Sequence, residues 1–144
     1  MTLSELADAV EGLSGPDREM DAAIFRAIGA PLPDEFAGKK IALTFDEARH
    51  AFFMDVGSDM VVRYEPPAYT ASIDAAMTLV PEGIGETPLS VMLQRTWEGI
   101  GKVRLLDSLG GQVWDGNAST PALALTAAAL RARAALASEN SNAE

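Results

Sequence analysis

The chain has 144 residues, 48% hydrophobic and 22% charged, values that fit one globular domain with a core and exclude wholesale disorder. Its 21 acidic and 11 basic residues give a net charge of −10 and it has no cysteine, which argues against direct binding of nucleic acid and excludes disulfides and thiolate metal sites. The first residues lack a basic and apolar leader, and no apolar run could cross a membrane. We therefore expect a soluble cytoplasmic protein.

The first third of the chain predicts two helices. Thr2 and Glu5 have the spacing of a capping box, which opens a helix ending near Gly12. The turn residues 14–17 precede a second helix, which Gly29 ends, with prolines beyond it. Apolar residues at helical spacing mark a core face in each: Leu3, Leu6, Val10 and Leu13 in the first, and Met20, Ala23, Ile24, Ala27 and Ile28 in the second.

The middle of the chain predicts strands and a third helix. β-branched and aromatic residues favour strands over 40–45, 51–56 and 60–64. Pro66 and Pro67 follow the last of these strands, and hydroxyl residues then open a helix. The face of this third helix is predicted from Ile73, Met77 and Val80, with Leu79 beside it.

The last third predicts a meander and a long helix. Strands over 89–97, 102–106 and 112–114 are separated by glycine-bearing turns, a pattern typical of antiparallel hairpins. A final helix is expected over 121–137, with a flexible polar tail over 138–144. Its predicted apolar stripe is Leu123, Ala127, Leu130 and Ala134, and Arg131 and Arg133 are assigned to the helix dipole.

This order of elements predicts an α/β (α+β) fold. The expected architecture is a layered sandwich with a mostly antiparallel sheet and about four helices, formed as a single domain over residues 1–137. The sequence shows no internal repeat that would suggest another architecture.

Four blocks of the sequence form a pattern of their own: Gly15–Asp21, Pro67–Gly83, Ala118–Leu125 and Ala129–Ala134. Together they resemble a known family, the phage ABA sandwich domain group, whose members are small proteins of phages and prophages. The resemblance implies an α-β-α layered domain and a phage or prophage setting in a bacterial host cell, and it implies no catalytic residues. The segments Lys39–Glu65 and Ile84–Pro88 lie outside it.

Hydroxyl and acidic residues at two helix starts form the first candidate site. They are Tyr69, Thr70, Ser72, Asp74 and Thr120. Hydroxyls at such positions cap the unpaired backbone amides of a first turn. The same amides can instead bind an anion, with the hydroxyls as further donors. Both interpretations stay open at this point.

The second candidate site is an acidic segment at the start of the second helix: Asp17, Arg18, Glu19 and Asp21. Carboxylates in the first turn of a helix interact favourably with the helix dipole and form local ion pairs. The alternative is a surface that binds a basic partner.

Metal and catalytic patterns are weak in this sequence. His50 is the single histidine; it would share a helix face with Asp46 if residues 45–50 were helical, but two ligands do not make a site. We therefore predict no metal. We also predict no cofactor and no catalytic residues, because the phosphate-loop, dinucleotide and nucleophile-elbow motifs are absent from the sequence. Trp97 and Trp114 are predicted to pack on sheet faces.

These patterns favour a phage or prophage accessory protein that works by binding and is not an enzyme. Its partner would be an unidentified protein; direct DNA binding and membrane insertion are not expected, and self-association stays open. One alternative is a small-ligand or anion-binding, enzyme-like domain that uses the helix start at Thr70. Another is an acidic decoy of nucleic acid that engages a basic host protein.

Overall fold

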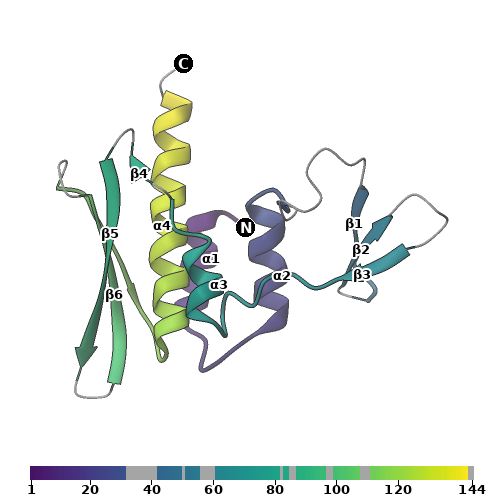
Figure 1. Cartoon of the computed structure of the whole chain (residues 1–144), viewed down its shortest axis with the longest axis horizontal. Coiled ribbons are helices and arrows are strands. Elements are labelled where there is room, and N and C mark those ends of the chain that lie inside the picture. The colour runs from purple at the N-terminus through teal and green to yellow at the C-terminus, as the bar shows by residue number, and fades with distance from the viewer. Residues whose placement is uncertain are drawn as a thin grey trace. The chain divides into compact units, whose positions relative to one another are not determined.

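The computed structural model describes residues 1–31, 42–49, 51–55, 61–81, 83–84, 87–96, 99–107 and 111–142. The chain divides into two compact units: a large unit, Met1–Arg18 with Ala68–Glu144, and a small unit, Glu19–Pro67. The described residues form helices α1–α4 and strands β1–β7, drawn in Figure 1. The α+β class with antiparallel sheets is confirmed, and the single domain over 1–137 stays a prediction.

The large unit contains a meander of antiparallel strands. Its members are β4 (Gly83–Ile84), β5 (Thr87–Thr96), β6 (Gly99–Asp107) and β7 (Val113–Asn117). Each strand pairs with the next one in the chain, in the order β4-β5-β6-β7. The predicted hairpins are therefore confirmed. The short β4 was not predicted, and β7 extends beyond the predicted strand, as far as Asn117.

Helix α4 (Pro121–Asn142) is the centre of the large unit. It contacts β6 and β7 of the sheet and also α1 (Leu3–Glu11) and α3 (Ile73–Met77). Figure 1 shows α4 between the sheet and these two shorter helices. The described helices of the large unit thus lie on one face of its sheet, so this unit alone does not have the helix–sheet–helix order that the resemblance implies.

The prediction of a single apolar stripe on α4 is wrong. Ala122 to Leu130 are buried without interruption, Thr126 included. A helix packed on both sides has no solvent face along that stretch, and the even spread of alanine and leucine around the helix is the sequence signal of such burial. The helix continues to Asn142, so residues 138–142 of the predicted tail are helical in the structure, and the tail's flexibility stays a prediction.

Helix α1 agrees with its sequence pattern. The Thr2 N–H donates to Glu5 Oε2 at 2.8 Å, and the Glu5 N–H donates to Thr2 Oγ1 at 3.1 Å, which completes the capping box. The helix ends at Gly12, and Leu6 and Val10 are buried against the rest of the unit.

The predicted face of α3 is wrong. Ile73 and Met77 are 41% and 42% exposed, whereas Ala76 and Leu79 are fully buried. Ala76 has no bulk beyond Cβ, which suits the approach of α3 to α4. Arg133 Nε on α4 donates to the Leu79 carbonyl oxygen at 2.6 Å and fixes the turn after α3. Arg133 therefore serves a tertiary contact and not the helix dipole.

The small unit consists of most of α2 (Arg18–Ala27) and a three-stranded antiparallel sheet. Its strands are β1 (Ala42–Asp46), β2 (Ala51–Asp55) and β3 (Val61–Tyr64), paired in that order. They confirm the three predicted strands where the structure describes them. Figure 1 shows them as a separate short sheet.

Aromatic packing decides which face of α2 is buried. The ring centroid of Phe25 lies 5.0 Å from that of Phe52 and 5.5 Å from that of Tyr64. Phe25 is buried, as are Ile24 and Ala22, whereas Ala27 is exposed. The predicted stripe of α2 is therefore wrong at Ala27 and misses Phe25, because spacing alone did not weigh the aromatic ring.

Candidate functional site

The residues Tyr69 and Thr70, just before α3, are buried; each is about 1% exposed. The Asp17 N–H donates to Thr70 Oγ1 at 2.8 Å, and that hydroxyl donates to the Asp17 carbonyl oxygen at 3.2 Å. Thr126 Oγ1 on α4 donates to the Tyr69 carbonyl oxygen at 2.9 Å. These bonds tie Asp17 and α4 to one interior turn, which is a structural arrangement.

Ser72 is the cap of α3. Its backbone is extended, and its Oγ accepts the Ala75 N–H at 3.3 Å. Asp74 is exposed in the first turn. Because α3 has only five residues, few aligned peptide dipoles support an anion at its start. The structure thus separates the two hydroxyls that the sequence could not tell apart: Ser72 caps, and Thr70 does not.

Thr120 opens a different helix, α4. Its Oγ1 accepts the Leu123 N–H at 3.2 Å, and its carbonyl oxygen accepts the Ala124 N–H at 3.0 Å. The neighbouring Ser119 Oγ donates to the Leu13 carbonyl oxygen at 2.9 Å. The capping interpretation accounts for the position of Thr120.

The structure does not place the four acidic-segment residues on one surface. Asp21 is fully buried. Asp17 is half-buried and its backbone is bonded to Thr70, while Arg18 and Glu19 are exposed. Of the three carboxylates predicted to bind a partner, Glu19 is therefore the exposed one.

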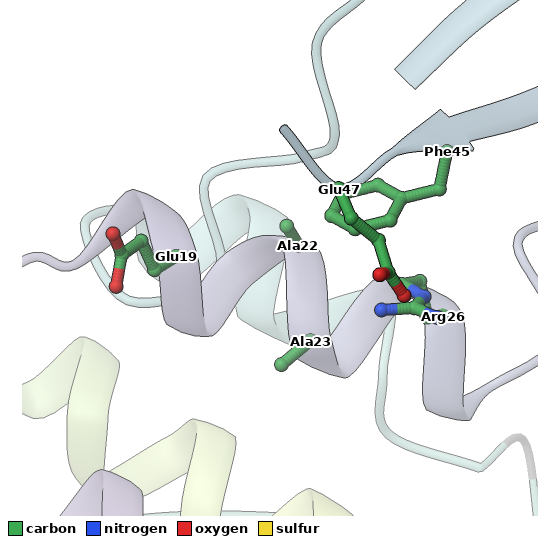
Figure 2. Close-up of a pocket in the computed structure, with 6 residues that line it drawn as sticks. All are labelled: Glu19, Ala22, Ala23, Arg26, Phe45 and Glu47. Atoms are coloured by element: carbon green, nitrogen blue, oxygen red, sulfur yellow. The ribbon is translucent and has the colours of Figure 1, made fainter. Parts of the chain in front are cut away.

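Glu19 belongs to an open pocket of about 450 Å³ on the small unit. Figure 2 shows the helical residues of the pocket along α2, with Phe45 of β1 opposite them. The side chains from α2 follow helical spacing, so they share one side of the helix. The lining consists of Glu19, Ala22, Ala23, Arg26, Phe45 and Glu47.

The lining of the pocket combines apolar side chains with two carboxylates and one guanidinium group. Ala22, Ala23 and Phe45 supply the apolar part of the lining. The Arg26 guanidinium carbon lies 4.3 Å from the Phe45 ring centroid, a cation–π contact. The carboxylates of Glu19 and Glu47 belong to exposed residues. The sequence pattern indicated Glu19 alone, because Phe45 and Glu47 come from a distant strand and its turn.

A second cluster, around Arg131, was not predicted. Arg131 Nη1 and Nη2 donate to Glu11 Oε2 at 2.8 Å and Oε1 at 2.6 Å, a bidentate pair between α4 and α1. Nη1 also donates to the Asp115 carbonyl oxygen at 2.8 Å, and Nη2 to Asp8 Oδ1 at 2.8 Å. The Asn117 N–H donates to Glu11 Oε2 at 2.7 Å. The cluster joins α1, β7 and α4.

The charges of this cluster are shifted by these contacts. The hydrogen bond from Arg131 lowers the pKa of Glu11 below its ordinary value of 4.5, while partial burial opposes the change. The hydrogen bonds to Glu11 and Asp8 raise the pKa of Arg131, so its guanidinium stays charged. The pair is half-buried, and both Nη atoms of Arg131 and both carboxylate oxygens of Glu11 have partners on α1, α4 or β7. It is therefore a clamp that holds the fold.

The histidine and tryptophan candidates are only partly described. His50 and Trp97 lie outside the described residues. Strand β1 ends at Asp46, whose Oδ1 accepts the backbone N–H groups of Ala48 and Arg49 at 3.0 and 3.2 Å, so the helix that would align Asp46 with His50 does not form. Among the residues described, no group of three histidine or carboxylate side chains is placed to hold a metal. Trp114 is half-buried and pairs with Leu105.

Comparisons with known proteins add no relative. No protein-family model matches the chain, and neither the curated proteins nor the solved structures give a match. Within the described part of the chain, no helix has the length and apolar character needed to cross a membrane.

Proposed function

We propose that this protein is a phage or prophage accessory protein that acts by binding another protein, and that the pocket on its small unit receives a basic segment of that partner. The phage setting rests on the resemblance carried by Gly15–Asp21 and the other three blocks. The mode of action rests on one observation, a pocket in which apolar side chains lie beside the exposed carboxylates of Glu19 and Glu47.

The shape and charge of the pocket suit a lysine or arginine side chain. Ala22, Ala23 and the Phe45 ring can pack against the aliphatic stem of the partner's lysine or arginine. The carboxylates of Glu19 and Glu47 can then meet the cationic head at the rim. Arg26 also lines the pocket, with its guanidinium over the Phe45 ring, so the two carboxylates outnumber the one resident positive charge. A net charge of −10 adds long-range attraction for a basic partner.

The test uses defined peptides. A fluorescein-labelled peptide of alternating lysine and alanine is titrated with the protein, and anisotropy is compared with that of a matched glutamate–alanine peptide. The lysine peptide should bind, more weakly as salt is added, and the glutamate peptide should not. Ala23→Leu fills the pocket and should weaken binding about tenfold, which is ~1.4 kcal/mol.

Two charge reversals of equal size separate the pocket from the general field. Glu47→Lys at the rim should also weaken binding of the lysine peptide about tenfold. Asp74→Lys changes the net charge equally, at an exposed site of the large unit, and should have a much smaller effect. Equal losses in both variants, together with no effect of Ala23→Leu, would contradict a pocket-based function.

A further inference from the structure

Strand β5 has a bare edge. Its inner neighbour β6 pairs with it from Leu89 onwards, whereas β4 pairs only with Thr87 and Pro88 on the opposite side. From Leu89 on, no strand in the described ranges pairs with that outer side. The register of β5 with β6 is regular up to Gln94, where a bulge follows. The bare edge is therefore the segment Leu89–Leu93, with Gln94 at its end.

The direction of the backbone groups along this edge follows from the next pairing. The Ala118 N–H donates to the Gly101 carbonyl oxygen and the Asp107 N–H to that of Gln112, so odd-numbered residues of β6 bond to β7. Even-numbered residues of β6 then bond to β5, because bonding sides alternate along an antiparallel strand. Their partners on β5 are Ser90, Met92 and Gln94. The N–H and C=O groups of Leu89, Val91 and Leu93 consequently point out of the sheet edge.

The side chains of these residues lie on an apolar face. Val91 pairs with the buried Leu105, and Leu93 with the buried Val103, so they share the face that packs against α4 further along the sheet. Because α4 contacts β6 and β7, Val91 and Leu93 stay 36% and 46% exposed. Exposed apolar residues on a bare edge are the features by which strands recruit another strand.

We infer that two copies of this chain pair through these edges, antiparallel, about a twofold axis at Val91. In this register Val91 faces Val91 of the second copy and Leu89 faces Leu93. Ser90 faces Met92 on the other side of the sheet. Each of the three outward-pointing residues both donates and accepts a hydrogen bond, and the two sheets become one.

The segment is fitted to its own copy more than to a general partner. About an axis at Val91, the apolar residues Leu89, Val91 and Leu93 of one copy meet only apolar residues of the other. Residues 87–96 contain no acidic residue in a chain of net charge −10, so two copies can meet there without opposing carboxylates. Centring on Val91 brings Gln94 of the second copy to Pro88, where β4 already pairs. The register with β6 also changes after Gln94, with Gly101 as the extra residue of β6, so the regular paired segment ends at this point.

A symmetric disulfide gives the direct test, because the native sequence has no cysteine. Residues facing each other in a hydrogen-bonded antiparallel pair have Cα atoms about 5.5 Å apart, within the range for a disulfide. Val91→Cys should give a covalent dimer on mild oxidation. Val113→Cys is the matched control, since Val113 is 44% exposed on β7 of the same sheet, and it should stay monomeric in denaturing electrophoresis.

Sedimentation of the native chain completes the test. At tens of micromolar the wild type should sediment as a dimer, and Val91→Lys as a monomer because two lysines would meet at the axis. Val113→Lys should sediment as the wild type, and both variants should keep the wild-type circular dichroism spectrum. A wild type that is monomeric at hundreds of micromolar, or a dimer that persists in Val91→Lys, would overturn the inference.

Discussion

Strands β7 and β5 of the large unit's sheet differ in how their side chains are packed. At β7 the sheet is covered by α4. The Asn117 N–H of this strand donates to Glu11 of α1, and the Asp115 carbonyl oxygen accepts from Arg131 of α4. At β5 the same sheet leaves Val91, Met92 and Leu93 exposed in succession. The comparison teaches that β7 carries contacts that hold this unit together, whereas β5 presents a run of apolar side chains to solvent. Substitutions at β7 should therefore change folding, and those at β5 association.

Gly116 on β7 should give the largest effect. A Cβ at this position would lie 1.9 Å from the Ala124 carbonyl oxygen and 2.9 Å from the Ala128 nitrogen, both backbone atoms of α4. Gly116→Ala must push the helix from the sheet, so the free energy of unfolding should fall by about 3 kcal/mol or more. Urea denaturation measures this loss. Gly15→Ala, with no atom within 4 Å of its Cβ, is the matched control and should be nearly neutral.

The Arg131 clamp should give the next effect. Arg131→Leu removes the charged groups that donate to the Glu11 carboxylate. This substitution should lower the free energy of unfolding by about 2 kcal/mol at neutral pH. A wild-type melting temperature in this variant would mean that the clamp does not stabilise the contacts of α1, β7 and α4.

The same clamp predicts a pH dependence with a definite sign. Because the pKa of Glu11 is lowered in the folded state, its contribution is present above 4.5, the ordinary value, and is lost as the pH falls through the folded pKa. The wild type should therefore lose stability on acidification below about pH 5 more steeply than Arg131→Leu. Parallel pH profiles from thermal denaturation would contradict this assignment.

The buried turn before α3 should follow. Thr70→Val keeps the shape of the side chain but removes both hydrogen bonds to Asp17. Because the half-buried Asp17 N–H would lose the Thr70 hydroxyl as its acceptor, we expect a loss of about 1–2 kcal/mol in the free energy of unfolding. Measured by chemical denaturation, an unchanged stability would show that this turn does not contribute to the core.

The cap of α3 should give the smallest effect. Ser72→Ala removes the acceptor for the Ala75 N–H and should cost about 1 kcal/mol, a fall of roughly 3 °C in the melting temperature of a chain this long. Ser72→Asp keeps an acceptor and is the rescue control. Thr70 does not cap α3, but its substitution should still lower stability because its hydroxyl bonds to Asp17.

Local chemistry made much of the fold predictable. The capping box of Thr2 and Glu5, the helix stop at Gly29 and the glycine-bearing hairpins all act within a few residues, so their sequence signals were sufficient. The alanine and leucine content of α4 also indicated burial on all sides, although only a single apolar stripe was predicted.

The candidate sites were less predictable because they depend on distant residues. Arg131 and Glu11 are 120 positions apart, and no local pattern connects them. The pocket joins Glu19 of α2 to Phe45 and Glu47, which come from another element. Spacing also favoured the wrong faces of α2 and α3, where the packing of Phe25 and the small size of Ala76 decided the outcome.

Amide hydrogen exchange along β5 tests the difference between the two sides most directly. In dilute protein the N–H groups of Leu89, Val91 and Leu93 should exchange fast, and those of Ser90, Met92 and Gln94 slowly, because these three bond to β6. At high concentration the first set should become protected while the second changes little, as pairing with a second copy requires. Exchange of Val91 that is slow in dilute protein, or that stays fast at every concentration, would contradict the account.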